Sequence, residues 1–112
     1  MKKIAIIGSM HIDGWEMLKK RNFEVFEIKD LSEKNLIKEL KNVNGIALRT
    51  AKLTQNVMKE CPNLRIVARH GVGYDNVDLD YLNSQKLALA VTGTANAVSV
   101  AEHVMTMFLC LI

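Results

Sequence analysis

The fold is decided by residues 45–73, whose sequence is GIALRTAKLTQNVMKECPNLRIVARHGVG. Residues 45–48 form a short apolar run typical of a buried strand, and residues 54–60 form a short helical segment that a Cys-Pro pair closes. Residues 64–68 are a second apolar run, and they lead into a glycine-containing loop at residues 71–73. A strand, a helix and a strand in this order predict a right-handed crossover between two parallel strands.

The same alternation continues on both sides of this unit. Five strands alternating with helices predict an α/β fold of the flavodoxin-like class. In this class a doubly wound, parallel five-stranded sheet is covered by helices on both faces. The expected strands are residues 4–7, 23–28, 45–48, 64–68 and 87–91. The expected helices are residues 11–21, a helix that begins at Ser32, residues 54–60, residues 79–84 and a last helix from residue 97. The Ser32 hydroxyl can cap the helix that begins there.

The last helix has an unusual composition. Residues 97–112 are apolar on nearly every helical face, and such a helix is buried on all sides or pairs with a partner. The chain ends inside this helix without a cap, a glycine or a polar tail. We therefore expect that the chain is a cut piece of a longer protein.

Composition and charge argue against several classes of protein. The formal net charge of +3 is mild, and the one dense basic run, residues 19–21, is typical of a solvated helix end rather than of a nucleic-acid surface. The apolar stretch at residues 104–112 is far shorter than the roughly 20 residues that cross a bilayer. Cys61 and Cys110 follow no metal or redox spacing, and we expect them to be reduced thiols of a cytoplasmic protein.

Two arginines follow neighbouring strands of the expected sheet. Arg49 comes directly after the third strand, and Arg69 comes directly after the fourth. Doubly wound sheets bind their ligands past the carboxyl ends of the strands, and a planar guanidinium suits a carboxylate or a phosphate. A surface arginine without a partner explains Arg49 equally well.

The loop after the fourth strand has the composition of an anion cradle. Gly71 and Gly73 let the backbone approach a ligand and aim successive N–H groups at an anion, although a tight turn would need the same glycines. The dinucleotide-binding fingerprint requires a third glycine at position 76, which Asn76 occupies. The loop therefore predicts a small-anion site rather than a cofactor pyrophosphate site.

Asn96 lies directly before the last helix. Its side chain can cap that helix or can donate to a substrate oxygen, and local chemistry favours the cap. Ser99 and Glu102 match a capping box within the same stretch. His103 has no carboxylate placed to orient it and is expected to be structural. No group of side chains has metal-ligand spacing, and no Ser or Cys nucleophile is flanked by a recognisable base.

Three segments, taken together and in order, carry a resemblance. They are RTAKLT at residues 49–54, GVGYDNVD at residues 71–78 and NAVSVAEH at residues 96–103. In these segments the chain resembles the D-isomer-specific 2-hydroxyacid dehydrogenases, and within them the phosphoglycerate dehydrogenase-like members. The resemblance in order and spacing extends from residue 45 onward, whereas residues 1–44 agree only in architecture.

The resemblance implies a two-domain enzyme that moves hydride between NAD and a small 2-hydroxy or 2-keto acid. In this family the glycine loop contributes N–H groups to the substrate carboxylate, and arginines hold the distal anionic group of the substrate. An asparagine before the last helix contacts the substrate, and one residue of the loop also touches the cofactor. The substrate-binding residues implied in this chain are Arg49, Arg69, Gly71, Val72, Gly73 and Asn96, and the implied cofactor contact is Val72.

The resemblance also implies a domain organisation. Residues 1–96 would be an incomplete substrate-binding domain, and residues 97–112 would begin the interdomain helix. The catalytic Arg, Glu and His and the NAD-binding domain would follow that helix and lie outside this chain. The isolated chain is therefore expected to be inactive, to bind NAD weakly at best and to form a homo-oligomer through residues 97–112. One departure is the linker, where Gly93-Thr94 replace the usual Pro-Gly, so that the hinge would be looser.

Two other functions are compatible with a chain of this size. The first is a stand-alone small-carboxylate-binding or regulatory module that dimerises through its last helix. The second is a phosphorylated receiver domain, which shares the fold but needs acidic residues after the first strand and an Asp after the third. Gly8-Ser9 and Arg49 occupy those places, which argues against a receiver domain.

Overall fold

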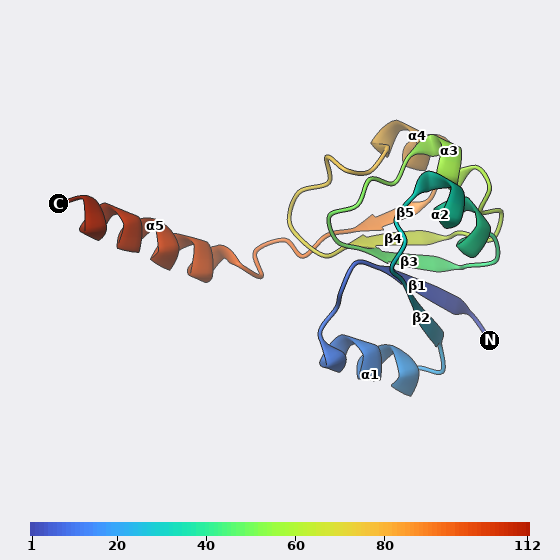
Figure 1. The fold of residues 1–112 in the computed structure, drawn as a ribbon, viewed down its shortest axis with the longest axis horizontal. Coiled ribbons are helices and arrows are strands. Elements are labelled where there is room, and N and C mark those ends of the chain that lie inside the picture. The colour runs from blue at the N-terminus through green and yellow to red at the C-terminus, as the bar shows by residue number, and fades with distance from the viewer.

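The computed structural model describes all 112 residues and contains one parallel five-stranded sheet. The strand order is β2-β1-β3-β4-β5, and every neighbouring pair is parallel (Figure 1). This order is the flavodoxin-like one, so the predicted fold class is confirmed. The strands are β1 (Lys3–Ile7), β2 (Glu24–Ile28), β3 (Gly45–Leu48), β4 (Ile66–Arg69) and β5 (Ala88–Ala90).

Five helices connect and follow these strands, as the sequence predicts. Helices α2, α3 and α4 lie on one face of the sheet, and α1 lies alone on the opposite face (Figure 1). The expected helix at residues 54–60 is shorter in the structure, where only Gln55–Met58 are helical. The helices are α1 (Ile12–Lys20), α2 (Glu33–Glu39), α3 (Gln55–Met58), α4 (Leu79–Ser84) and α5 (Ala97–Leu111).

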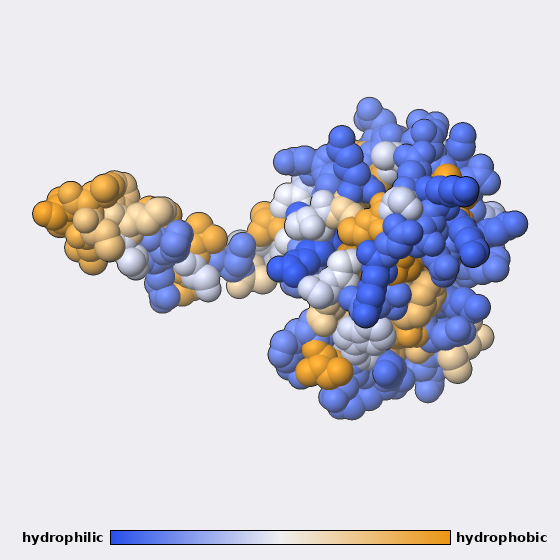
Figure 2. Space-filling view, in the orientation of Figure 1, coloured by the Kyte–Doolittle hydropathy of each residue, from blue (hydrophilic) through white to orange (hydrophobic).

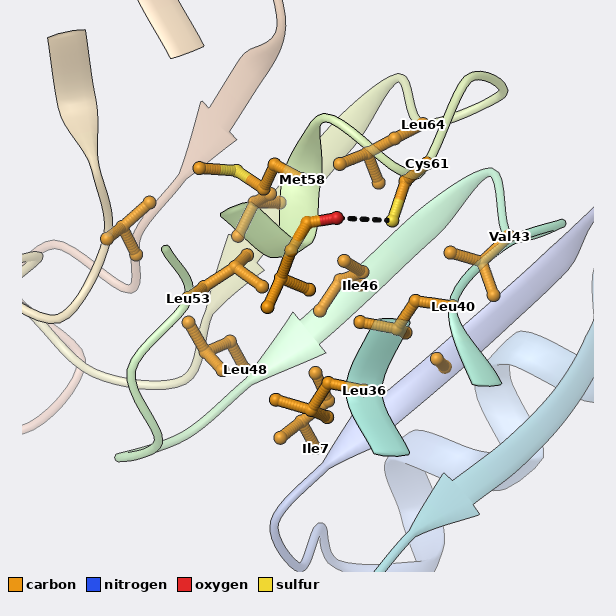
Figure 3. Packing of buried hydrophobic residues seen from close by; sticks show 14 of the residues in the cluster. Ile7, Leu36, Leu40, Val43, Ile46, Leu48, Leu53, Met58, Cys61 and Leu64 are labelled. Atoms are coloured by element: carbon orange, nitrogen blue, oxygen red, sulfur yellow. Dashed lines mark hydrogen bonds between the residues drawn. The ribbon is translucent and has the colours of Figure 1, made fainter. Parts of the chain in front are cut away.

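The hydrophobic core lies between the sheet and helices α2, α3 and α4 (Figure 3). Ile46 and Leu48 alternate with Ala47 along β3, so both larger side chains enter the core. The Cys61 thiol belongs to this core and donates to the Val57 carbonyl oxygen at 3.3 Å. Burial, with the nearby Glu60 carboxylate, raises the pKa of Cys61 to about 11. Cys61 therefore stays protonated at neutral pH and packs as a structural residue, and both cysteines are free thiols, as expected.

The opposite face of the sheet is only half covered. Helix α1 contacts β2, whereas no helix lies over β4 and β5 on this face. Ile66 is 38% exposed, and Ala88 and Ala90 are also exposed. The expectation of helices on both faces is therefore wrong for this half of the sheet. The reason is that α5, which follows β5, extends away from the sheet instead of crossing it (Figure 1).

Helix α5 is not part of the core. It contains no buried residue, and its outer half presents a mostly apolar surface that projects from a mostly hydrophilic body (Figure 2). Of the two alternatives expected for this helix, burial on all sides does not occur within the chain by itself. Pairing with a partner stays a prediction. The helix also has one polar stripe, because its polar residues recur at a spacing of three and four: Ser99, Glu102, His103 and Thr106. None of the five helices combines the length and the apolar character that crossing a membrane requires.

Two expected helix caps are absent from the structure. Ser32 and Asn96 precede α2 and α5, but neither side chain accepts a capping hydrogen bond. The Asn96 carbonyl oxygen instead accepts from the Val100 N–H at 3.0 Å, which is the first bond of the helix itself. Ser99 lies inside α5, so the capping box is wrong as well. A side-chain cap does form at α4, where Asp78 accepts from the Tyr81 N–H at 3.1 Å.

Candidate functional site

The register of β3 and β4 brings the two candidate loops together. Leu48 pairs with Arg69, so Arg49 and His70 leave the sheet side by side. The His70 N–H donates to the Leu48 carbonyl oxygen at 2.6 Å, and the Thr92 N–H donates to the Gly71 carbonyl oxygen at 3.0 Å. Backbone hydrogen bonds thus join the loops after β3, β4 and β5 at the carboxyl edge of the sheet, where this fold binds ligands.

The Arg49 side chain turns toward the loop after β1. Its Nη1 donates to the Ser9 hydroxyl oxygen at 2.9 Å. Gly8 has a φ of +95°, and a Cβ added there would lie 3.0 Å from the Cβ of Arg49. The absence of a side chain at Gly8 therefore leaves room for the Arg49 side chain. Ser9 was not identified from the sequence as a partner of Arg49. Its place after the first strand, at the edge where this fold binds ligands, could have indicated it.

The Arg69 side chain turns toward the other end of its own loop. Its Nε donates to Asn76 Oδ1 at 3.1 Å, and its Nη1 donates to the His70 carbonyl oxygen. Gly71 has a φ of +151°, and a Cβ added there would overlap Arg69 Nη1 and lie 2.9 Å from Arg69 Cζ. The structure thus holds Arg49 and Arg69 on different partners, and the two guanidinium groups share none.

The glycine loop offers two unpaired N–H groups rather than three. The Gly71 N–H donates to the Arg69 carbonyl oxygen at 3.0 Å, so it is already used. The N–H groups of Val72 and Gly73 donate to no group of the protein, and both residues are exposed. Two adjacent N–H groups that face water beside an arginine can bind a carboxylate or a similar small anion.

An open depression of about 300 Å³ lies beside these loops. It is bounded by the loop after β1, the first turn of α1, the carboxyl ends of β3 and β4 and the start of the linker after β5. Its size suits a small organic acid. The residues that line it are Met10, His11, Gly14, Ala47, Ala68, Arg69, His70 and Thr92.

Asn96 and His103 stand apart from this depression. The Asn96 side chain is exposed and makes no hydrogen bond, and His103 is exposed on α5. Neither lines the depression. No three His, Cys, Asp or Glu side chains are grouped closely enough to hold a metal ion.

The loop does not fit the pyrophosphate of a dinucleotide. Asn76 fills the place of the third glycine, and its amide is engaged with Arg69 and with two carbonyl oxygens. The next helix, α4, begins only at Leu79, so no helix N-terminus follows the glycines directly. An NAD site of the usual kind is therefore not built from these residues.

Comparison with known proteins shows the family. The family model described as "D-isomer specific 2-hydroxyacid dehydrogenase, catalytic domain" matches residues 4–106. The chain therefore belongs to the D-isomer specific 2-hydroxyacid dehydrogenase family, and the resemblance found in the sequence is confirmed.

Two curated relatives illustrate the match. The D-3-phosphoglycerate dehydrogenase of Sus scrofa is 34% identical over 112 residues, which is 99% of this chain and 21% of that protein. Formate dehydrogenase 1 of Saccharomyces cerevisiae is 44% identical over 62 residues, which is 55% of this chain and 16% of that protein. The chain thus spans about a fifth of the length of the phosphoglycerate dehydrogenases it matches.

Solved structures of NAD-bound enzymes share the fold. The NAD⁺-bound 3-phosphoglycerate dehydrogenase of Entamoeba histolytica has a TM-score of 0.84 and 28% identity, over 96% of this chain and 38% of that chain. The NAD-dependent formate dehydrogenase of Staphylococcus aureus has a TM-score of 0.81 and 25% identity, over 96% of this chain and 37% of that chain.

Proposed function

We propose that this chain is the substrate-binding part of an NAD-dependent oxidoreductase that acts on the CH–OH group of a D-2-hydroxy acid, as a phosphoglycerate dehydrogenase does. The observation that carries the proposal is the carboxyl edge of the sheet, where Arg69 lines a depression of suitable size. Arg49 and the two unpaired N–H groups lie on the loops that follow β3 and β4 at the same edge, although they do not line the depression itself. The names of the relatives agree with this chemistry. The two free thiols suit a cytoplasmic location.

Each candidate residue has a role in this proposal. The guanidinium groups of Arg49 and Arg69 hold the distal anionic group of the acid, because a planar fork matches a carboxylate or a phosphate. The N–H groups of Val72 and Gly73 hold the substrate carboxylate, and Gly71 supplies the backbone conformation that frees them. Asn96 approaches the substrate from the linker when the cleft closes, and the exposed Val72 side chain faces the cofactor.

The domain organisation follows from the same proposal. Residues 1–96 form the incomplete substrate-binding domain, and residues 97–112 begin an interdomain helix. The core lies entirely within residues 5–82, which supports a boundary before α5. NAD and the residues that transfer hydride and protons belong to the remainder of the parent enzyme, and no catalytic residue is assigned to this chain.

The isolated chain is expected to bind 3-phosphoglycerate weakly and without turnover. Half a cleft supplies half the contacts, so we expect weak but measurable binding, with a dissociation constant of about 1 mM. Replacing Arg49 with glutamine removes a charge-assisted interaction and should weaken binding about tenfold or more. A nuclear magnetic resonance titration that follows the N–H signals of Val72 and Gly73 measures both constants.

A control variant separates this effect from net charge. Arg65→Gln removes the same charge from an exposed residue before β4, at the opposite edge of the sheet, and should leave binding unchanged. Equal weakening by both variants would show non-specific attraction and refute the site. NADH formation from 3-phosphoglycerate and NAD by the isolated chain would refute its proposed inactivity, and submicromolar binding of the acid would favour a stand-alone binding module.

We also propose that residues 97–112 pair with a second copy of the chain. The side chains of Phe108 and Leu111 in the outer half of α5 are 63% and 83% exposed, and an apolar surface of this kind is seldom left in water (Figure 2). The full chain should sediment as a dimer or a larger species, whereas residues 1–96 should sediment as a monomer. The shortened chain keeps the whole core, so it should remain folded. A monomeric full chain at high concentration would contradict the pairing.

A further inference from the structure

We propose that Asn76 is the positioning residue of the anion site, which holds the Arg69 guanidinium and ties the loop after β4 to the loop after β3. This inference rests on the proposed function only in calling the site substrate-binding. Position 76 is the place where the dinucleotide fingerprint would have its third glycine. The structure gives the asparagine side chain at this position three hydrogen bonds.

The amide of Asn76 uses both of its ends. Its Oδ1 accepts from Arg69 Nε at 3.1 Å. Its Nδ2 donates to the Ala51 carbonyl oxygen at 2.8 Å and to the Arg49 carbonyl oxygen at 3.3 Å. An arginine can only donate and a carbonyl oxygen can only accept, so the reversed amide would lose all three bonds. An asparagine in this one orientation therefore connects both arginine-bearing loops.

The backbone of the same residue is anchored independently. The Asn76 carbonyl oxygen accepts from the Leu53 N–H at 2.8 Å, and the Asp78 N–H donates to the Leu53 carbonyl oxygen at 3.3 Å. Leu53 and Val77 form a bridge between the two loops, and both are buried in the core. Loss of the Asn76 side chain therefore leaves the loop attached, and its main consequence falls on Arg69.

The contact decides which part of the Arg69 guanidinium can meet a ligand. Of the five N–H donors of an arginine, the one on Nε is taken by Asn76 and one on Nη1 by the His70 carbonyl oxygen. The free donors are those of Nη2 and the second donor of Nη1. Arg69 can therefore bind an anion through its terminal nitrogens, Nη1 and Nη2. Because Asn76 occupies Nε, an anion cannot accept a pair of hydrogen bonds that includes Nε.

The test uses two substitutions of Asn76 and two readouts. Asn76→Leu keeps a similar volume and removes all three hydrogen bonds. Asn76→Asp keeps an acceptor for Arg69 Nε but turns a carboxylate oxygen toward the Ala51 and Arg49 carbonyl oxygens. The readouts are the exchange with solvent of the Arg69 Nε–H signal in nuclear magnetic resonance spectra and the titration with 3-phosphoglycerate.

The two variants should differ in the first readout. The Arg69 Nε–H signal should be protected in the unsubstituted chain, lose its protection in Asn76→Leu and keep it in Asn76→Asp. Binding of 3-phosphoglycerate should weaken about tenfold or more in Asn76→Leu. Asn83→Leu, at an exposed asparagine of α4, should change neither readout.

The outcomes separate positioning from a structural role. Unchanged protection and unchanged acid binding in Asn76→Leu, with only a lower unfolding free energy, would overturn the inference. If the unsubstituted chain does not bind 3-phosphoglycerate, the proposed function fails for this chain. The loss of Arg69 Nε–H protection in Asn76→Leu would then still establish the positioning contact, and its persistence would still refute it.

Discussion

Replacing Leu48 with alanine is expected to lower the free energy of unfolding by about 3 kcal/mol. Leu48 ends β3 in the middle of the sheet, and its side chain is fully buried in the core (Figure 3). Truncation removes transfer free energy and leaves a cavity that the surrounding strands can fill only in part. Small domains are stable by only about 5–15 kcal/mol, so this loss is a large fraction of the total. Urea unfolding followed by circular dichroism measures it.

A second leucine provides the matched control for this prediction. Leu31 is 43% exposed and lies outside the core, so Leu31→Ala should cost well under about 1 kcal/mol. A loss as large for Leu31→Ala as for Leu48→Ala would mean that burial does not decide the difference. Leu48→Ala should also weaken acid binding, because Arg49 directly follows the truncated residue and its backbone would lose its support.

Replacing Gly71 with alanine is expected to abolish measurable binding of 3-phosphoglycerate. The φ of +151° strains any side chain at this position, at a cost of about 1–3 kcal/mol. The added Cβ would also occupy the place of the Arg69 guanidinium, which would have to leave Asn76 and the His70 carbonyl oxygen. Both the arginine and the two free N–H groups would move. Titration with the acid and the exchange of the Arg69 Nε–H report these changes separately.

Gly73→Ala is the control within the same loop. A Cβ on Gly73 would find only Asp75 Oδ1, at 4.0 Å, and the φ of Gly73 is not positive. This variant should keep the unfolding free energy and the Arg69 Nε–H protection of the unsubstituted chain. If Gly73→Ala disturbed Arg69 as much as Gly71→Ala, the steric explanation would be wrong.

The order of strands and helices was predictable because local patterns carry it. Apolar runs of strand length alternate with helical segments, and right-handed crossovers leave few ways to arrange five of them. The bounds of β3 and α4 agree with those expected, whereas β4 begins at Ile66, two residues later than expected. Strand ends depend on which neighbour supplies the hydrogen bonds, and a local pattern does not contain this information.

The residue types of the candidate site were predictable from the sequence, but the hydrogen-bond partners of their side chains were not. The positions of Arg49, Arg69 and the glycine loop after two strands indicate an anion site. The sequence treated Asn76 only as a missing glycine, and the helix-cap interpretation of Asn96 was wrong. The missed contacts of Asn76 and the wrong cap at Asn96 have one cause, since the packed fold, and not the neighbouring residues in the chain, decides the partners of a side chain.

The sequence by itself thus determined the family, the class of fold and the residue types at the carboxyl edge of the sheet. Only the tertiary structure decided that Gly71 already uses its own N–H, and that β4 and β5 lack a helix on one face. It also decided that Asn76 joins two loops across 25 residues of chain. The physical reason is that the register of the sheet brings together hydrogen-bond partners that are distant in the chain. The spacing of apolar residues and the composition describe only residues that are close in the chain.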